Sequence, residues 1–219
     1  MIKESYIEFV SFYGCNLKNL FISHEPKSHS LVVLFPGRGY TCDMPLLYYA
    51  GMSTLFKGCD VLNLEYGFYK ADKNYVSEDF NKVVNEIATI INMCTLNSYS
   101  NIYFISKSLG TLFAGELSVR MSNYNIKNLF LTPLEETIPY MISTKCIGVT
   151  GSQDKAFPSS SIGFVKNNSN TEIIIIDDVG HSLETEKSTT TNLEILQHIV
   201  KLYEDFVCTF PKADTEVYA

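Results

Sequence analysis

The alternation of continuous apolar runs and amphipathic stretches along the chain predicts an α/β fold. Short apolar runs such as residues 31–35 (LVVLF) are typical of strands that are covered on both faces. Residues 76–93 and 109–121 carry apolar side chains at the three- and four-residue spacing of a helix that packs one face on a core. Strands and helices therefore alternate, as they do in the βαβ units of a parallel sheet.

The same pattern divides most of the chain into elements. Residues 6–12 and 17–23 are rich in β-branched and aromatic residues and flank a turn at Gly14, so they predict an antiparallel hairpin. The other predicted strands are 31–35, 60–64, 101–105, 127–131, 146–150 and 171–176, and the predicted helices are 44–56, 76–93, 109–121 and 192–207. We expect one domain over residues 1–219, with a mostly parallel sheet, helices on both of its faces and a frayed tail at 211–219.

Composition narrows the classes of partner. With 46% hydrophobic and 19% charged residues, the chain has enough apolar surface for a globular core. A net charge of −7 disfavours nucleic acid and anionic membrane surfaces, so we expect neither as a partner. No apolar run has the length of a signal peptide or of a membrane span, which predicts a cytoplasmic protein. The pattern leaves monomer and homodimer equally open.

The six cysteines are widely spread along the chain. They form no C-x-x-C pair and have no histidine at the spacing of a metal ligand. We therefore expect reduced, mostly buried thiols and no metal site.

The segment that carries most chemistry is 101–110 (NIYFISKSLG), where an apolar strand runs directly into a helix. A nucleophile on such a tight turn requires small residues two positions before and two positions after it, because the backbones come close together there. Ser106 and Gly110 meet that requirement around Ser108, with serine at the first position in place of the usual glycine. The following helix favours the negative charge that develops during acyl transfer. The alternative is that Ser106 or Ser108 only caps the helix.

A serine hydroxyl needs an imidazole base, and His181 is the best placed of the four histidines. It lies in the loop after strand 171–176, at the strand end where open α/β sheets place their sites. His24 and His29 lie in the polar loop before the first central strand, and His198 lies within the last predicted helix. A purely structural histidine is the alternative for His181.

The group that orients the imidazole is expected to be Asp154. It follows strand 146–150 and lies between Ser108 and His181, in the chain order of nucleophile, acid and base that one class of catalytic triad uses. Asp177 and Asp178 are rivals, although their closeness to His181 in the chain fits solvation of a strand end better.

An oxyanion hole requires two backbone N–H groups that point at the same oxygen. Leu109, directly after Ser108, is expected to supply the first. The second is expected from Arg38 in the loop 35–40 (FPGRGY), whose glycines let the backbone approach a substrate. The alternative is an ordinary turn that ends the strand.

These segments, in this order, resemble the α/β-hydrolase superfamily from about residue 31 to residue 202. The resemblance implies a mostly parallel sheet of about eight strands, no metal and no organic cofactor, and catalysis through an acyl-enzyme. Pro36 departs from the histidine that many members carry before the oxyanion glycine. The connection 132–145, where members usually insert a lid, leaves space for little more than one helix over 134–142.

The expected function is hydrolysis of a small-molecule carboxylic ester or thioester with a small or medium acyl group. Tyr40, Tyr66 and Phe68 in the loops after the early strands, together with Lys107 beside Ser108, are the expected substrate contacts. An acyltransferase or a small peptidase on the same fold is the nearest alternative. A binding module without turnover is the other.

Overall fold

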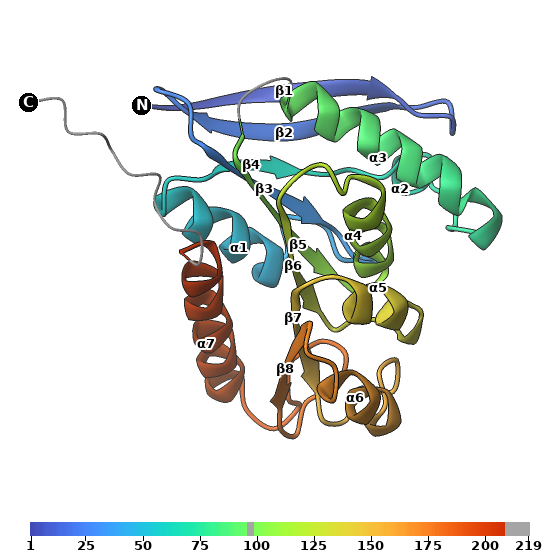
Figure 1. Ribbon diagram of the computed structural model, residues 1–219, viewed down its shortest axis with the longest axis vertical. Helices are drawn as coiled ribbons and strands as arrows, with labels where there is room; N and C mark the ends of the chain where they lie inside the picture. Colours follow the sequence, from blue (N-terminus) through green and yellow to red (C-terminus); the bar gives the residue numbers. More distant parts are fainter. Residues whose placement is uncertain (96–98, 209–219) are drawn as a thin grey trace, which may run out of the picture.

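The computed structural model describes residues 1–95 and 99–208, and its strands form one eight-stranded sheet (Figure 1). The strands are β1 (Ile2–Val10), β2 (Asn16–His24), β3 (Ser30–Phe35), β4 (Asp60–Asn63), β5 (Asn101–Lys107), β6 (Ile126–Leu131), β7 (Cys146–Gly151) and β8 (Thr171–Ile176). Their order in the sheet is β1-β2-β4-β3-β5-β6-β7-β8, with β2 antiparallel to both β1 and β4 and all other pairs parallel. The predicted α/β fold with a mostly parallel sheet is confirmed.

Helices cover both faces of this sheet (Figure 1). They are α1 (Pro45–Phe56), α2 (Gly67–Lys70), α3 (Phe80–Thr95), α4 (Leu109–Arg120), α5 (Ile138–Ser143), α6 (Ser159–Lys166) and α7 (Thr189–Val207), with 3-10 helices η1 (Ser77–Asp79) and η2 (Glu135–Thr137). Helices α1 and α7 pack on one face, and α3, α4 and α6 pack on the other, so each face has its own apolar cluster.

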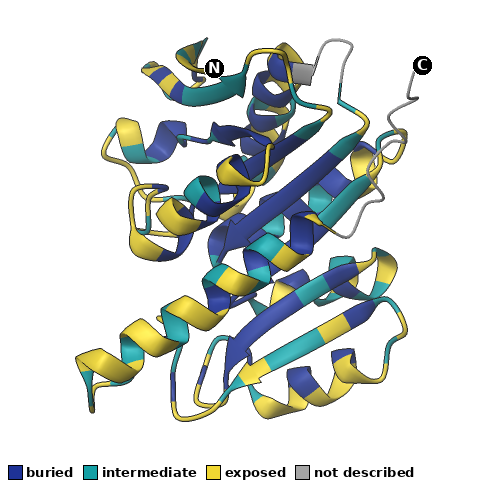
Figure 2. Cartoon of the chain, turned by 90° about the vertical axis from the view of Figure 1, so that its left-hand side faces the viewer, coloured by how far each residue is buried: buried dark blue, intermediate teal, exposed yellow. Residues whose placement is uncertain are grey.

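The central strand β3 shows why its sequence is continuously apolar. Leu31, Val33 and Phe35 point to the layer of α3 and α4, whereas Val32 and Leu34 point to the layer of α1 and α7. All five are fully buried, because both faces of the strand are covered. In Figure 2, which looks onto the α1 and α7 layer, buried strands lie behind helices whose outer faces are exposed.

The structure adds helices that the apolar pattern did not predict. Helix α6 buries only Ser161, Ile162 and Val165, so it has too few apolar positions to show a helical period. Helix α2 is a single turn that begins at a glycine. The predicted tail at 211–219 lies outside the described residues. Within residues 1–95 and 99–208, no helix combines the length and the apolar character needed to cross a bilayer.

Candidate active site

Four loops that the sequence singled out meet at one edge of the sheet. Ser108 follows β5, Asp154 follows β7, His181 follows β8, and the loop with Arg38 follows β3. Because these strands are parallel, their carboxyl ends all lie at the same edge. The topology therefore gathers residues from distant parts of the chain into a single site.

Ser108 has a strained backbone, with φ 50° and ψ −119°. Its side chain makes no capping hydrogen bond to α4, so the alternative of a simple helix cap is wrong for this residue. Gly110 lies so close to β3 that an added Cβ would be 2.5 Å from the carbonyl oxygens of Phe35 and Pro36. Ser106 is buried, and its Oγ donates to the carbonyl of Leu129 over 3.4 Å. The turn thus needs the small residues that the sequence has there.

Ser108, His181 and Asp154 form one continuous hydrogen-bonded chain. The Nε2 of His181 lies 2.8 Å from the Oγ of Ser108. The Nδ1 of the same ring lies 2.9 Å from Oδ2 and 3.0 Å from Oδ1 of Asp154. With a proton on Nδ1 held by the carboxylate, Nε2 is free to accept the proton of the serine hydroxyl.

Asp154 is the fully buried end of this chain, whereas the His181 side chain is 37% exposed. Burial raises the pKa of Asp154, but it is outweighed by hydrogen bonds from His181 and from the backbone N–H of Ala156, and by the nearby charge of Lys107. The pKa of Asp154 is therefore below its usual range. The carboxylate stays ionised and can stabilise an imidazolium.

The rival acids and bases lie elsewhere. Asp178 is exposed, and its carboxylate accepts hydrogen bonds from Lys187 and Gln153 instead of His181. Asp177 is also exposed. Of the other histidines, His24 pairs with Asp60 on β4, and His198 is exposed on α7. Among the described residues, Asp154 is the carboxylate that bonds the His181 ring.

The loop after β3 passes directly beside the nucleophile. An added Cβ at Gly37 would lie 3.3 Å from the Cβ of Ser108. Tyr69 holds this loop in shape, since its hydroxyl donates to the carbonyl of Gly37 over 2.9 Å and accepts from the N–H of Gly39. The N–H of Gly37 is bonded to the carbonyl of Tyr40.

Within the described residues, the backbone N–H groups of Arg38 and Leu109 have no hydrogen-bond acceptor. Leu109 is the first residue of α4, where a helix leaves its N–H groups unsatisfied. These are the two N–H groups that the sequence predicts for an oxyanion hole. The sequence does not predict that Tyr69 shapes this loop, because no local pattern relates Tyr69 to Gly37.

Burial changes two of the predicted substrate contacts: Phe68 lies in the core, whereas Tyr66 remains only in the wall of a cavity. Phe68 is completely buried in the apolar cluster with α3 and α4, and Tyr66 is only 2% exposed and stacks on Phe68. Tyr66 lies directly before α2 and Phe68 lies within it, and both rings pack in this cluster. Tyr40 is half-buried, and its hydroxyl accepts a hydrogen bond from the N–H of Leu46 in α1.

Lys107 is the third correction. It is 3% exposed, and its Nζ donates to the Oγ1 of Thr132 over 2.7 Å and to the carbonyl of His181 over 2.9 Å. The side chain is therefore used inside the protein and does not line a substrate mouth. Thr132 was missed by sequence reasoning, although its position directly after β6 places it at the same edge as the other loops.

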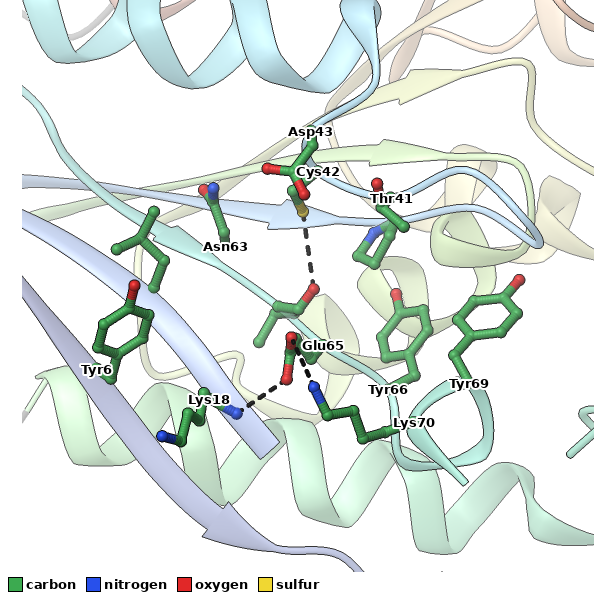
Figure 3. A pocket seen from close by; sticks show the side chains of 13 residues that line it. Tyr6, Lys18, Thr41, Cys42, Asp43, Asn63, Glu65, Tyr66, Tyr69 and Lys70 are labelled. Carbon is green, nitrogen blue, oxygen red and sulfur yellow. Dashed lines mark hydrogen bonds and ion pairs between the residues drawn. The ribbon is translucent and has the colours of Figure 1, made fainter. Parts of the chain in front are cut away.

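A cavity of about 390 Å³ borders the loop after β3, from which Pro36 lines it. Figure 3 shows the side chains around this cavity. Its walls come from the β1–β2 hairpin, the segment around Cys42 and the chain from Asn63 to Lys70. The hydroxyl of Tyr66 is buried there without a hydrogen-bond partner in the described residues. A second cavity of about 170 Å³ lies between α1, α7 and the loop after His181. Ser108, Asp154 and His181 line neither of these two cavities.

The connection 132–145 forms only η2 and the short α5. It packs on α4, where Thr111 and Thr137 share a hydrogen bond of 2.7 Å between their hydroxyls. In the part of the chain that the structure describes, no cluster of His, Cys, Asp and Glu could hold a metal ion. The four loops thus offer amide, hydroxyl, imidazole and carboxylate groups for chemistry.

Comparison with known proteins supports the fold independently. No protein-family model and no curated protein sequence matches the chain. Among solved structures, an α/β serine hydrolase homologue from Coxiella burnetii is 13% identical, with a TM-score of 0.69 over 90% of this chain and 96% of the other.

Two further structures are similar to the same extent. Est1E from Butyrivibrio proteoclasticus, solved with ferulic acid bound, is 14% identical, with a TM-score of 0.71 over 92% of this chain and 97% of the other. The esterase Pf2001 from Pyrococcus furiosus is 12% identical, with a TM-score of 0.68 over 93% of this chain and 91% of the other. At such identities the likeness is one of fold, and the chain has the α/β-hydrolase fold.

Proposed function

We propose that this protein is a serine hydrolase that cleaves carboxylic esters or thioesters through an acyl-enzyme. Ser108 Oγ attacks the acyl carbon while His181 Nε2 takes its proton, and the N–H groups of Leu109 and Arg38 stabilise the oxyanion. His181 then returns the proton to the leaving group. Water, activated by the same imidazole, cleaves the acyl-enzyme and restores Ser108.

The observation that carries this proposal is the unbroken chain from Asp154 through His181 to Ser108, with hydrogen bonds of 2.9 and 2.8 Å. The positive φ of Ser108 adds support, because a strained nucleophile position is typical of such turns. The partial exposure of His181 gives water access to the acyl-enzyme, as hydrolysis requires. Product analysis with an added alcohol or amine competing against water would separate hydrolysis from acyl transfer.

We predict that a fluorophosphonate probe labels the native protein covalently at Ser108. The probe reports the activated hydroxyl itself, so the test needs no knowledge of the natural substrate. Peptide mapping by mass spectrometry would locate the adduct. Modification of Ser106 instead would mean that the nucleophile is misassigned, and the absence of any adduct would favour a binding module without turnover.

We also propose that the acyl group is small or medium in size. The short connection that forms η2 and α5 packs on α4, and neither described cavity is lined by the triad. Each methylene buried in an apolar tunnel would add about 0.8 kcal/mol of binding, so a long-chain enzyme would gain specificity with chain length. A connection as short as η2 and α5 leaves little chain to cover a long acyl group.

The expected order of kcat/KM on p-nitrophenyl esters is therefore acetate to butyrate above decanoate and palmitate. The measurement is a series of initial rates with esters of graded chain length. A maximum at ten carbons or more would show that the site accepts long chains and that the proposed acyl size is wrong.

A further inference from the structure

A lysine ammonium lies in the interior directly behind the nucleophile. Lys107 precedes Ser108 in the chain and is 3% exposed. Its Nζ donates to the Oγ1 of Thr132 over 2.7 Å and to the carbonyl oxygen of His181 over 2.9 Å. The same atom lies 5.2 Å from the centroid of the Tyr40 ring, which presents its π-face to the cation. One side chain thus contacts the loops after β3, β6 and β8.

Burial of an ammonium group costs free energy unless hydrogen bonds or opposite charges compensate for the lost water. Burial lowers the pKa of Lys107 to about 8, against the opposing attraction of Asp154 and Glu184. The charged or titratable groups that face it are therefore Asp154 from the loop after β7, Glu184 and His181 from the loop after β8, and Tyr40. The two hydrogen bonds and the Tyr40 ring partly compensate the burial of the ammonium.

We propose, resting on the proposed function, that Lys107 is a positioning residue that ties the His181 loop to the strand that carries Ser108. The imidazole has to reach Ser108 and Asp154 at the same time, at 2.8 and 2.9 Å. Its backbone lies in the loop after β8, which the buried side chains of Val179 and Leu183 anchor on either side of His181. Within the described residues, the hydrogen bond to the His181 carbonyl comes from Lys107. The bond from Lys107 fixes that carbonyl relative to the nucleophile turn, and Thr132 fixes the direction of the ammonium.

Because Lys107 is charged, the strength of its hydrogen bond to the His181 carbonyl depends on pH. A hydrogen bond from an ammonium to a carbonyl is stronger than one from a neutral amine. Since the pKa of Lys107 is about 8, the ammonium is present below that pH and is lost as the pH rises through it. The reaction of Ser108 should therefore slow above about pH 8, although a neutral histidine base remains available there.

The test compares Lys107→Met with Lys166→Met, a control that removes an exposed lysine from the end of α6. The readout is the rate of fluorophosphonate labelling at Ser108 as a function of probe concentration, from pH 6 to pH 10. For Lys107→Met we expect the maximal labelling rate constant to fall by about 10- to 100-fold, because small displacements of a catalytic group have effects of this size. The apparent Kd of the probe should stay unchanged, since Lys107 is buried away from it.

The pH profile separates positioning from mere packing. The wild type and Lys166→Met should lose rate above about pH 8, whereas Lys107→Met should show no decline in that range. A folded Lys107→Met variant with the wild-type rate and profile would overturn the inference. A raised probe Kd at an unchanged maximal rate would overturn it too, because Lys107 would then be a substrate contact.

A second pair of variants serves if Lys107→Met does not fold. Thr132→Val removes one of the two acceptors of the ammonium, and we expect it to lower the maximal labelling rate several-fold. Thr132→Ser keeps the hydroxyl and should keep the rate near that of the wild type. Equal rates for the two would contradict the inference. If the wild type itself is not labelled, the proposed function fails and the inference with it, whereas a labelled wild type with unaffected variants overturns the inference alone.

Discussion

Replacement of Ser108 by alanine is expected to lower ester hydrolysis by at least about 10⁴-fold, to the level that binding and the oxyanion hole alone provide. In the proposed mechanism this hydroxyl is the nucleophile, so its removal stops the formation of the acyl-enzyme. The loss of folding stability should be small, because Ser108 is only half-buried. The variant loses one hydrogen bond, to His181, which contributes about 1 kcal/mol. Initial rates would measure the loss of activity, and a thermal melt on the same preparation would measure the change in stability.

Ser106→Ala is the matched control for this variant. Ser106 lies on the same strand end but is buried, and its Oγ makes only one long hydrogen bond, to the carbonyl of Leu129. We expect most of the activity to remain in this variant. If Ser106→Ala were inactive and Ser108→Ala active, the assignment of the nucleophile would be reversed.

Asp154→Asn is expected to reduce kcat by a factor of about 10⁴. An asparagine amide can donate to Nδ1 of His181, which would favour the tautomer with the proton on Nε2 and so block proton transfer from Ser108. The carboxylate also stabilises the imidazolium, and the amide does not. The measurement is kcat at saturating ester, with Asp178→Asn as the control because Asp178 is exposed and accepts hydrogen bonds from Lys187 and Gln153. A larger loss in Asp178→Asn would move the assignment to that residue.

Asp154→Asn should also change how the stability of the folded protein depends on acid pH. The pKa of Asp154 is lower in the folded protein than its usual range, so the ionised carboxylate contributes stability above that range. This contribution is lost as the pH falls through the lowered pKa. The wild type should therefore lose more stability toward acid pH than Asp154→Asn, which has no such group to protonate. Urea unfolding at several acid pH values would measure the difference.

Much of the fold was determined by the sequence alone, because the signals are periodic and local. The runs around Val32 and Phe104 are continuously apolar, which predicts strands covered on both faces, and the structure buries both residues completely. Chain order then related Ser108, Asp154 and His181 to the ends of parallel strands, and the structure brings them within hydrogen-bond distance. Whether they act as proposed is left to the variants above.

Tertiary structure alone decided which side chains near the site point inward. The sequence predicts a substrate contact at Lys107, beside Ser108. The pleat of β5 instead places its side chain on the same face as Tyr103 and Ile105, toward Tyr40 and the His181 loop. The aromatic side chains of Tyr66 and Phe68, in the loop after an early strand, likewise predict a mouth, but both rings pack in the apolar cluster with α3 and α4. Local patterns give the position of a residue along a strand or loop, but its partners come from segments far away in the chain, and only packing brings them together.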